Sequence, residues 1–224
     1  MKNFVVGLTL SGLTILAVIY TIRNFYNSRL DLVTVKTKEP SDINELKNGD
    51  LIFQTSLSEQ SKAIQLATKS KYSHCGIIFI ENGSYFVFEA VQPVKSTPLD
   101  KWIARGKNGH YVIKRLKNSN AVLTAEVIKK MQREGKMLKG KNYDLTFEWS
   151  DEKIYCSELI WKIYKRATGL ELGKLEKLEN FDLTSEVVKK KMKERYGDKI
   201  PKDEIVVSPA AIFESELLMT VKSN

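Results

Sequence analysis

The sequence predicts an α+β domain in which an antiparallel sheet packs against helices. A β-hairpin pattern spans residues 74–91, and helical patterns span residues 121–136 and 156–168. Because strands and helices follow one another in blocks and do not alternate as βαβ units, the pattern is typical of the α+β class. The chain has 224 residues, of which 42% are hydrophobic and 28% charged, and this composition suits one domain with one sizeable core.

The first thirty residues differ from the rest of the chain. Residues 4–22 carry no charge and are long enough to cross a bilayer as a helix. A transmembrane anchor and a cleaved signal peptide are both open, because Lys2 supplies a basic start but no A-x-A-like cleavage site follows the apolar run. We therefore divide the chain into an anchor or signal segment at 1–30, a linker at 31–45 and a folded domain at 46–224. We expect the domain to be exported, and to be membrane-anchored if the segment is retained or secreted or periplasmic if it is cleaved.

Basic residues outnumber acidic residues, which gives a formal net charge of +9. The excess is concentrated in runs such as residues 189–191, three consecutive lysines. Nucleic-acid recognition requires a basic face interleaved with aromatic residues or a known motif, and the sequence has neither. A solvated helix face and attraction to an anionic surface such as lipid headgroups both remain open for this run. We predict no nucleic-acid partner.

The N-terminal half of the domain predicts a strand, a helix and a hairpin, in that order. The strand covers residues 51–53, directly after a turn-like Asn-Gly-Asp. The Ser56-x-x-Glu59 pattern has the form of a capping box and predicts a helix that runs to about Thr68. In the hairpin, residues 82–83 are Asn-Gly, the pair favoured in type I′ turns between two β-rich runs.

The C-terminal half predicts further strands and helices. The expected elements are a third strand of the sheet at 110–116, helices at 121–136, 156–168 and 182–197, and a last strand at 204–208. Gly169 ends the second of these helices, since glycine is common just beyond helix C-termini. Asp182 or Thr184 caps the third helix.

Cys156 is placed in the first turn of its predicted helix, on the apolar face. Ile160, Ile163 and Ala167 share this face, because residues three or four positions apart lie one above another on a helix. The unpaired N–H groups and the positive end of the helix dipole stabilise a thiolate in the first turn, and they can also hold an oxyanion. The alternative is a small core residue, because free cysteine often packs as a small hydrophobe.

His74 and Glu89 are predicted to lie on one face of the hairpin. With residues 82–83 as the turn, position 76 faces Glu89, and the strand period of two places His74 on the same face. Glu89 can then hold one imidazole nitrogen while the other takes a proton from a thiol. The alternative is a solvent-facing carboxylate, which the apolar neighbours of Glu89 make unfavourable. His110 lies in a glycine-containing loop and is expected to be an exposed side chain.

Cys75 is predicted to project from the opposite face of the strand to His74. If Cys156 meets His74 on one face, it cannot pair with Cys75 on the other, which argues against a disulfide. A disulfide stays an alternative for an exported chain with two cysteines. The two histidines and two cysteines have none of the usual zinc-ligand spacings. We predict no metal and no other cofactor.

The motifs NGDLIF, YSHCGIIF, FEAV and NYDLTF, followed by IYCSELI, resemble those of the permuted papain-like enzymes of the YiiX/YaeF type, relatives of the NlpC/P60 hydrolases. The resemblance covers about residues 46–170, and VVSPAAIFES is similar to the family's closing segment. It implies a circularly permuted papain-like fold in which the histidine strand precedes the cysteine helix. It also implies Cys156 as nucleophile, His74 as base and Glu89 as the residue that orients the base. Cys75 departs from the pattern, because an aliphatic residue is expected there.

We expect a cysteine hydrolase that cleaves an amide bond, of a cell-wall peptide or of a lipid-like molecule, through a thioacyl-enzyme. Tyr155, Ser157 and Gln54 are candidates for the oxyanion or substrate-binding site, and Ser157 is also placed to support the start of the helix. One alternative is a thiol acyltransferase or lipid hydrolase of the same fold. Another is a membrane-tethered binding module that does not turn over.

Overall fold

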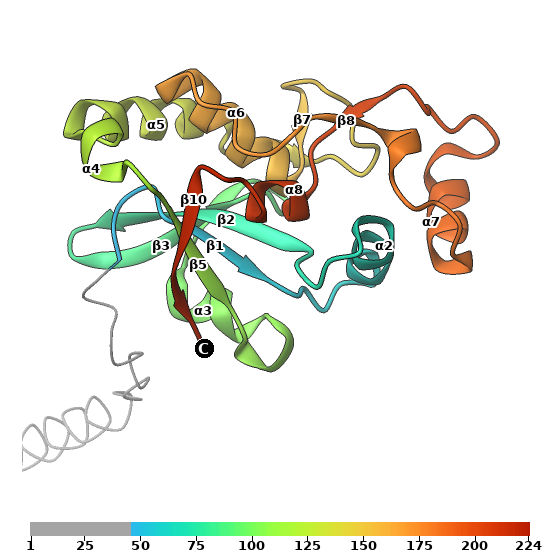
Figure 1. The fold of residues 1–224 in the computed structure, drawn as a ribbon, viewed down its shortest axis with the longest axis horizontal. Helices are drawn as coiled ribbons and strands as arrows, with labels where there is room; N and C mark the ends of the chain where they lie inside the picture. Colours follow the sequence, from blue (N-terminus) through green and yellow to red (C-terminus); the bar gives the residue numbers. More distant parts are fainter. Residues whose placement is uncertain (1–45) are drawn as a thin grey trace, which may run out of the picture. The chain divides into compact units, whose positions relative to one another are not determined.

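A computed structural model describes residues 46–224, and the predicted anchor or signal segment and linker, residues 1–45, lie outside the described residues. Six strands form one antiparallel sheet in the order β10–β5–β1–β2–β3–β4 (Figure 1). The strands are β1 (Leu51–Gln54), β2 (His74–Glu81), β3 (Ser84–Glu89), β4 (Lys95–Pro98), β5 (Val112–Leu116) and β10 (Leu218–Ser223). The predicted α+β class is confirmed.

The β2–β3 hairpin has the predicted register. Glu81 pairs with Ser84 next to the turn, and Ile77 pairs with Phe88 further along. The two turn residues, at 82–83, have φ values of 50° and 77°. Positive φ at both central residues is the requirement of a type I′ turn, which explains the Asn-Gly pair. The register places His74 and Glu89 on one face of the sheet.

Helices cover the sheet and extend beyond one end of it (Figure 1). They are α2 (Glu59–Thr68), α3 (Leu99–Ala104), α4 (Ser119–Val122), α5 (Ala125–Leu138), α6 (Cys156–Thr168), α7 (Glu186–Tyr196) and α8 (Pro209–Phe213), with 3-10 turns η2 (Lys107–Gly109) and η3 (Leu178–Asn180). Two short strand pairs join β6 (Asn142–Tyr143) to β7 (Lys153–Ile154) and β8 (Glu176–Lys177) to β9 (Ile205–Val206).

The main core lies between the sheet and helices α5 and α6. Cys75, Ile77 and Phe88 share one face of the sheet and belong to one buried cluster with Leu159 of α6. Gly135 of α5 lies directly over the Phe88 ring, where an added Cβ would be 3.1 Å from the ring edge. The absence of a side chain at this position therefore allows α5 to pack closely on β3.

A second, smaller cluster joins α2 to α7. Its buried members are Ala63 of α2, Val188 and Met192 of α7, Leu178 of η3 and Val206 of β9. Segments from the start and the end of the domain thus meet here (Figure 1). This cluster lies next to the N-terminal end of α6, so it borders the predicted nucleophile.

Three predicted helix boundaries are wrong. The residue before α2 is Ser58, not Ser56. Helix α7 is capped by Ser185 and not by Asp182 or Thr184. The Ser185 side chain accepts a hydrogen bond from the Val188 N–H. The predicted helix over 121–136 is divided in two because the Thr124 side chain caps a new helix, α5. A serine or threonine beside other small polar residues offers several equivalent caps, and local sequence does not choose among them.

The predicted last strand, at 204–208, is shorter than expected. Only Ile205–Val206 is a strand, and it pairs with β8 outside the main sheet. The sheet is instead completed by β10, an edge strand that pairs with β5. Its residues are mostly exposed, so it has no strong alternation of buried and exposed positions.

Within residues 46–224, no helix is both long enough and apolar enough to cross a membrane.

Candidate active site

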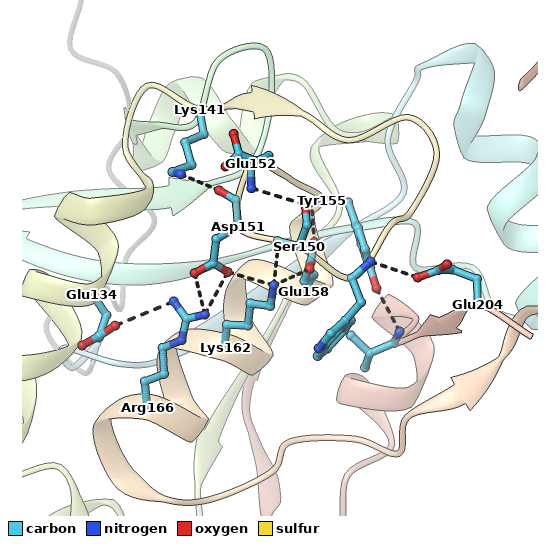
Figure 2. Close-up of polar contacts among 12 residues, drawn as sticks. Glu134, Lys141, Ser150, Asp151, Glu152, Tyr155, Glu158, Lys162, Arg166 and Glu204 are labelled. Atoms are coloured by element: carbon cyan, nitrogen blue, oxygen red, sulfur yellow. Dashed lines mark hydrogen bonds and ion pairs between the residues drawn. The ribbon is translucent and has the colours of Figure 1, made fainter.

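Helix α6 begins at Cys156 and is fixed near its N-terminus by a network of polar side chains (Figure 2). The Tyr155 N–H donates to the Glu158 carboxylate, which also lies 2.7 Å from the Lys162 ammonium. Lys162 in turn donates to Asp151 at 2.9 Å, and Arg166 donates to the same carboxylate at 2.8 Å. Two successive turns of α6 are therefore tied to the loop before it, which holds the first turn in place.

The His74 ring and the Glu89 carboxylate form the predicted pair. His74 Nε2 and Glu89 Oε2 are 2.6 Å apart, and Glu89 is fully buried. Nε2 is engaged by Glu89, so Nδ1 is the ring nitrogen left free, and His74 also interacts with the Cys156 thiol. The structure thus brings Cys156, His74 and Glu89 together, and the hairpin register predicted the His74–Glu89 pair.

Glu89 has three further partners that the sequence analysis missed. Thr97 and Arg105 donate to Oε1 at 2.6 and 2.5 Å, and Trp102 Nε1 donates to Oε2 at 2.9 Å. The Trp102 ring also stacks on His74, with centroids 5.8 Å apart. All three residues come from β4, α3 and the residue after α3. A buried carboxylate requires several hydrogen-bond donors. The donor side chains that follow β3 in the sequence were therefore the signal that could have identified these partners.

These contacts set the charge of the pair. Burial by itself would lower the pKa of His74, but its contacts with Cys156 and Glu89 outweigh this effect and raise the pKa to about 9. Burial would raise the pKa of Glu89, but the hydrogen bond to His74, with Thr97 and Arg105, lowers it overall. The arrangement therefore favours an imidazolium next to an ionised carboxylate.

The Cys156 sulfur contacts both Cys75 and His74. The hydrogen bond from the Cys75 thiol, together with His74, lowers the pKa of Cys156 well below its ordinary value, although burial opposes the shift. Burial, with the neighbouring Cys156, raises the pKa of Cys75. Cys156 is thus the acidic thiol of the two and Cys75 its hydrogen-bond donor.

The prediction that Cys75 cannot meet Cys156 is wrong. Helix α6 packs on the face of β2 that carries Cys75, not on the face that carries His74. His74 still reaches the sulfur because it is the first residue of β2 and lies at the end of the sheet. Both thiols are free in the structure, so the contact between them is non-covalent.

The tentative oxyanion residues have different surroundings. Gln54 is buried opposite His74 in the register, and its Oε1 has no hydrogen-bond partner. The Tyr155 hydroxyl accepts a hydrogen bond from the Val207 N–H, and the Ser157 hydroxyl donates to the Val207 carbonyl. Tyr155 and Ser157 therefore hold the segment before α8 against the start of α6.

Tyr143 also lies beside the nucleophile and was not among the predicted site residues. Its hydroxyl accepts a hydrogen bond from Gln60, so the phenolic proton is left free to donate. Burial and then the proximity of Cys156 raise the pKa of Tyr143, which keeps that proton on the oxygen. Tyr143 is thus a neutral hydroxyl donor near the sulfur.

Two hollows meet at this site. A cleft of about 520 Å³ is lined by Gln54, His74 and the 90–92 segment, among others. A narrower cavity of about 90 Å³ has Cys156 in its wall and extends between α2 and α7. Both hollows are lined by Gln60, Ile64 and Tyr143. These shared residues mark the boundary between the hollow that contains Cys156 and the cleft that contains His74.

Three polar residues, His110, Asp50 and Asp144, have partners outside the site. His110 Nδ1 is 2.6 Å from the carbonyl oxygen of Asn224 and so joins the end of the chain to the loop before β5. Asp50 accepts two hydrogen bonds from Arg115, both at 2.7 Å. Asp144 accepts from the N–H of Thr146 and fixes its own turn. These contacts are structural. His110 lies outside the site, but it is half-buried and not exposed as expected, because the end of the chain packs against it.

Comparison with known proteins gives a relative and a solved structure. The chain is 47% identical over 194 residues to the uncharacterized protein YiiX of Escherichia coli strain K12, an alignment that covers 87% of this chain and 95% of YiiX. The fold matches the crystal structure described as metalloprotein yiiX from Escherichia coli O157:H7, with 49% identity and a TM-score of 0.76. This match covers 80% of the present chain and 97% of the crystallised one.

The crystallised relative is described as a metalloprotein, but the present site lacks a set of free metal ligands. In the described part of the chain, no group of three or more His, Cys, Asp or Glu side chains is placed to hold a metal ion. Glu89 is already saturated by four donors, and His74 is held between Glu89 and Cys156. These residues do not fit a metal centre, and we assign no step to a metal.

The family described as permuted papain-like amidase enzyme, YaeF/YiiX, C92 family, matches residues 45–222. The match spans nearly the whole described domain, including the β2 histidine and the α6 cysteine. Family membership supports a function of the cysteine-hydrolase type. The chain therefore belongs to the permuted papain-like amidases of the YaeF/YiiX type.

Proposed function

We propose that the protein is a cysteine hydrolase that cleaves amide bonds through a Cys156–His74–Glu89 triad. The observation that carries this proposal is the buried carboxylate–imidazole pair next to a thiol of lowered pKa. A structural cysteine in a core needs no buried ion pair beside it, and burying one is costly. The pair is thus explained best by the chemistry of the thiol.

In the proposed reaction, the Cys156 thiolate attacks the carbonyl carbon of the amide, and the C–S bond forms as the carbonyl π electrons move to oxygen. His74, as imidazolium, then gives its Nδ1 proton to the leaving amine as the C–N bond breaks. Water, deprotonated by His74, hydrolyses the resulting thioester and restores the thiol. Glu89 holds the ring in one tautomer and stabilises its positive charge throughout.

The oxyanion is held by donors near the start of α6. The free N–H groups of the first helical turn point out of the helix end, and the helix dipole adds a partial positive charge. The Tyr143 hydroxyl is the side-chain donor that the geometry favours, since its proton is free and it lines both hollows. Gln54 is a second candidate from the opposite wall of the cleft. Each such donor is worth about 10²–10³-fold in rate.

We place the hydrolase domain outside the cytoplasm, tethered by the apolar run at residues 4–22. This part of the proposal rests on the length and apolarity of that run.

Product analysis tests the proposed activity. The purified protein and Cys156→Ala would each be incubated with cell-wall peptide fragments and with N-acyl lipids, and new amines and acids would be identified by mass spectrometry. We expect new products that require Cys156. If the two proteins give identical product profiles, the domain is a binding module and the hydrolase proposal is wrong.

A further inference from the structure

The two cysteines of the chain lie against each other. Cys75 is the second residue of β2 and Cys156 is the first residue of α6, and both belong to the buried cluster in which α6 packs on β2. The Cys75 thiol is hydrogen-bonded to the Cys156 sulfur, and both thiols are free. Because the sequence contains only these two cysteines, all of its thiols meet at one point beside the proposed base.

Packing alone does not require a thiol at position 75. The Cys75 side chain is fully buried in the same cluster as Ile77, Phe88 and Leu159, where a small aliphatic side chain would also be accommodated. A buried free cysteine packs as a small hydrophobe, and its redox reactivity is what distinguishes it from an alanine or a valine. The contact with a second sulfur gives this reactivity a partner.

A small oxidant can reach Cys156 but not Cys75. Cys156 lies in the wall of the narrow cavity of about 90 Å³, and a molecule of the size of water needs only about 10–15 Å³ of such space. Cys75 is fully buried and lines neither this cavity nor the wider cleft. Cys156 is therefore the sulfur that an oxidant meets first, and Cys75 is held in reserve behind it.

The two sulfurs also differ in charge in the way that such a sequence of steps requires. The thiolate is the form of cysteine that reacts with peroxides. The Cys75 thiol and His74 lower the pKa of Cys156 well below its ordinary value, whereas burial and the neighbouring Cys156 raise the pKa of Cys75. A low-pKa thiol next to a second, resolving thiol is the arrangement typical of redox-sensing cysteines.

We propose that Cys156 and Cys75 form a reversible oxidation site for hydrogen peroxide. The Cys156 thiolate attacks one peroxide oxygen, the O–O bond breaks, and the departing hydroxide takes the proton of the His74 imidazolium and leaves as water. The Cys75 sulfur then attacks the sulfur of the Cys156 sulfenic acid. An S–S bond forms, the S–O bond breaks, and the hydroxyl group leaves as water with the Cys75 proton. The two sulfurs thus lose two electrons, which the peroxide accepts.

The disulfide would switch the site off and protect it at the same time. A disulfide sulfur carries no thiolate, so Cys156 could not attack a carbonyl until the bond is reduced. A sulfenic acid without a neighbouring thiol proceeds to sulfinic acid, which is irreversible for most proteins. This inference goes beyond the proposed function and does not depend on amide cleavage, since it requires only the two thiols and the peroxide.

Thiol mapping before and after oxidation tests the site. The reduced full-length protein would be treated with excess hydrogen peroxide, and iodoacetamide under denaturing conditions would then mark the remaining thiols for peptide mass spectrometry. We expect both cysteines to be lost together, a cross-linked pair of peptides that lacks two hydrogens, and full return of both thiols with dithiothreitol. Sulfinic acid at Cys156 with Cys75 still free, disulfides between two chains, or two thiols that stay unoxidised would each overturn the proposal and would leave the product analysis of the proposed hydrolase unaffected.

Cys75→Ser is the matched variant. Its hydroxyl can still donate a hydrogen bond to the Cys156 sulfur, but it cannot form a disulfide. The same peroxide treatment should therefore convert Cys156 of this variant to sulfinic acid, which dithiothreitol does not reduce. If Cys75→Ser does not fold, as judged by a thermal melt, Cys75→Val serves the same purpose. Recovery of the Cys156 thiol in either variant as complete as in the wild type would show that Cys75 is not the resolving thiol, and would contradict the proposal.

Discussion

Glu89→Gln removes one charge from the centre of the site without changing the size of the side chain. In the wild type, each carboxylate oxygen accepts two hydrogen bonds, Oε1 from Thr97 and Arg105 and Oε2 from Trp102 and His74. Whichever way the amide is turned, its NH₂ group faces two donors. On either side at least one of these donors, Thr97 or Trp102, is buried, and leaving it without an acceptor costs about 1–3 kcal/mol, so we expect the free energy of unfolding to fall by at least that amount.

The same substitution changes the ionisation of His74. An opposite charge within about 4–6 Å typically shifts a pKa by about 1–3 units, so the pKa of His74 should fall by that amount from its value of about 9. The ratio of thiolate–imidazolium to neutral pair then falls about 10- to 1000-fold, because each unit is a factor of ten. The chain has only two histidines, so NMR titration of the ring signals resolves His74 once His110→Ala has assigned the other.

Asp50→Asn is the matched control. Asp50 is also fully buried and accepts two hydrogen bonds from an arginine, Arg115. Its substitution should lower the melting temperature, but it should leave the pKa of His74 at about 9. If Glu89→Gln leaves the His74 titration where Asp50→Asn leaves it, Glu89 does not control the base, and the proposed role of the carboxylate is wrong.

We expect three further outcomes, two from the structure and one from the sequence of the first thirty residues. His74→Ala should reduce turnover by about 10²–10⁴-fold and His110→Ala should leave it nearly unchanged; equal losses in steady-state rate would refute the assignment of the base. Phe88→Ala should lower the free energy of unfolding by about 3–5 kcal/mol in a denaturant titration, because it empties the contact with Gly135, while the pH profile of thiol alkylation stays the same; a shifted profile would place Phe88 in the site. The mature protein should retain residues 1–23 and fractionate with membranes, and a mature N-terminus between residues 20 and 35, found by mass spectrometry, would exclude the anchor.

The hairpin and the cysteine helix were predictable because their signals are local. An Asn-Gly pair fixes the turn, the turn fixes the register, and the period of two then places His74 and Glu89 on one face. The helix from Cys156 has an apolar face and ends at Gly169, whose φ of 80° favours glycine. No long-range information is needed for either element.

The rest of the site depends on contacts between distant segments. Trp102 and Arg105 come from a helix of six residues and the position after it, too short to show a helical period. The strand period of two predicted the face of β2 on which Cys75 lies, but it could not predict which face α6 covers. The contact between the two sulfurs was therefore not predicted. The cavity beside Cys156 is lined by α2 and α7, more than a hundred residues apart, and only the folded chain brings them together.

The central claim is that Cys156 is an activated nucleophile, and the pH dependence of its alkylation by iodoacetamide tests this claim most directly. Peptide mass spectrometry would give the rate separately for Cys156 and Cys75 in the unmodified sequence. Because the Cys75 thiol and His74 hold the pKa of Cys156 well below its usual range, Cys156 should still react at mildly acidic pH, and Cys75 should stay unreacted. A Cys156 profile that rises only around 8.5, the free thiol value, or prior modification of Cys75, would contradict the account.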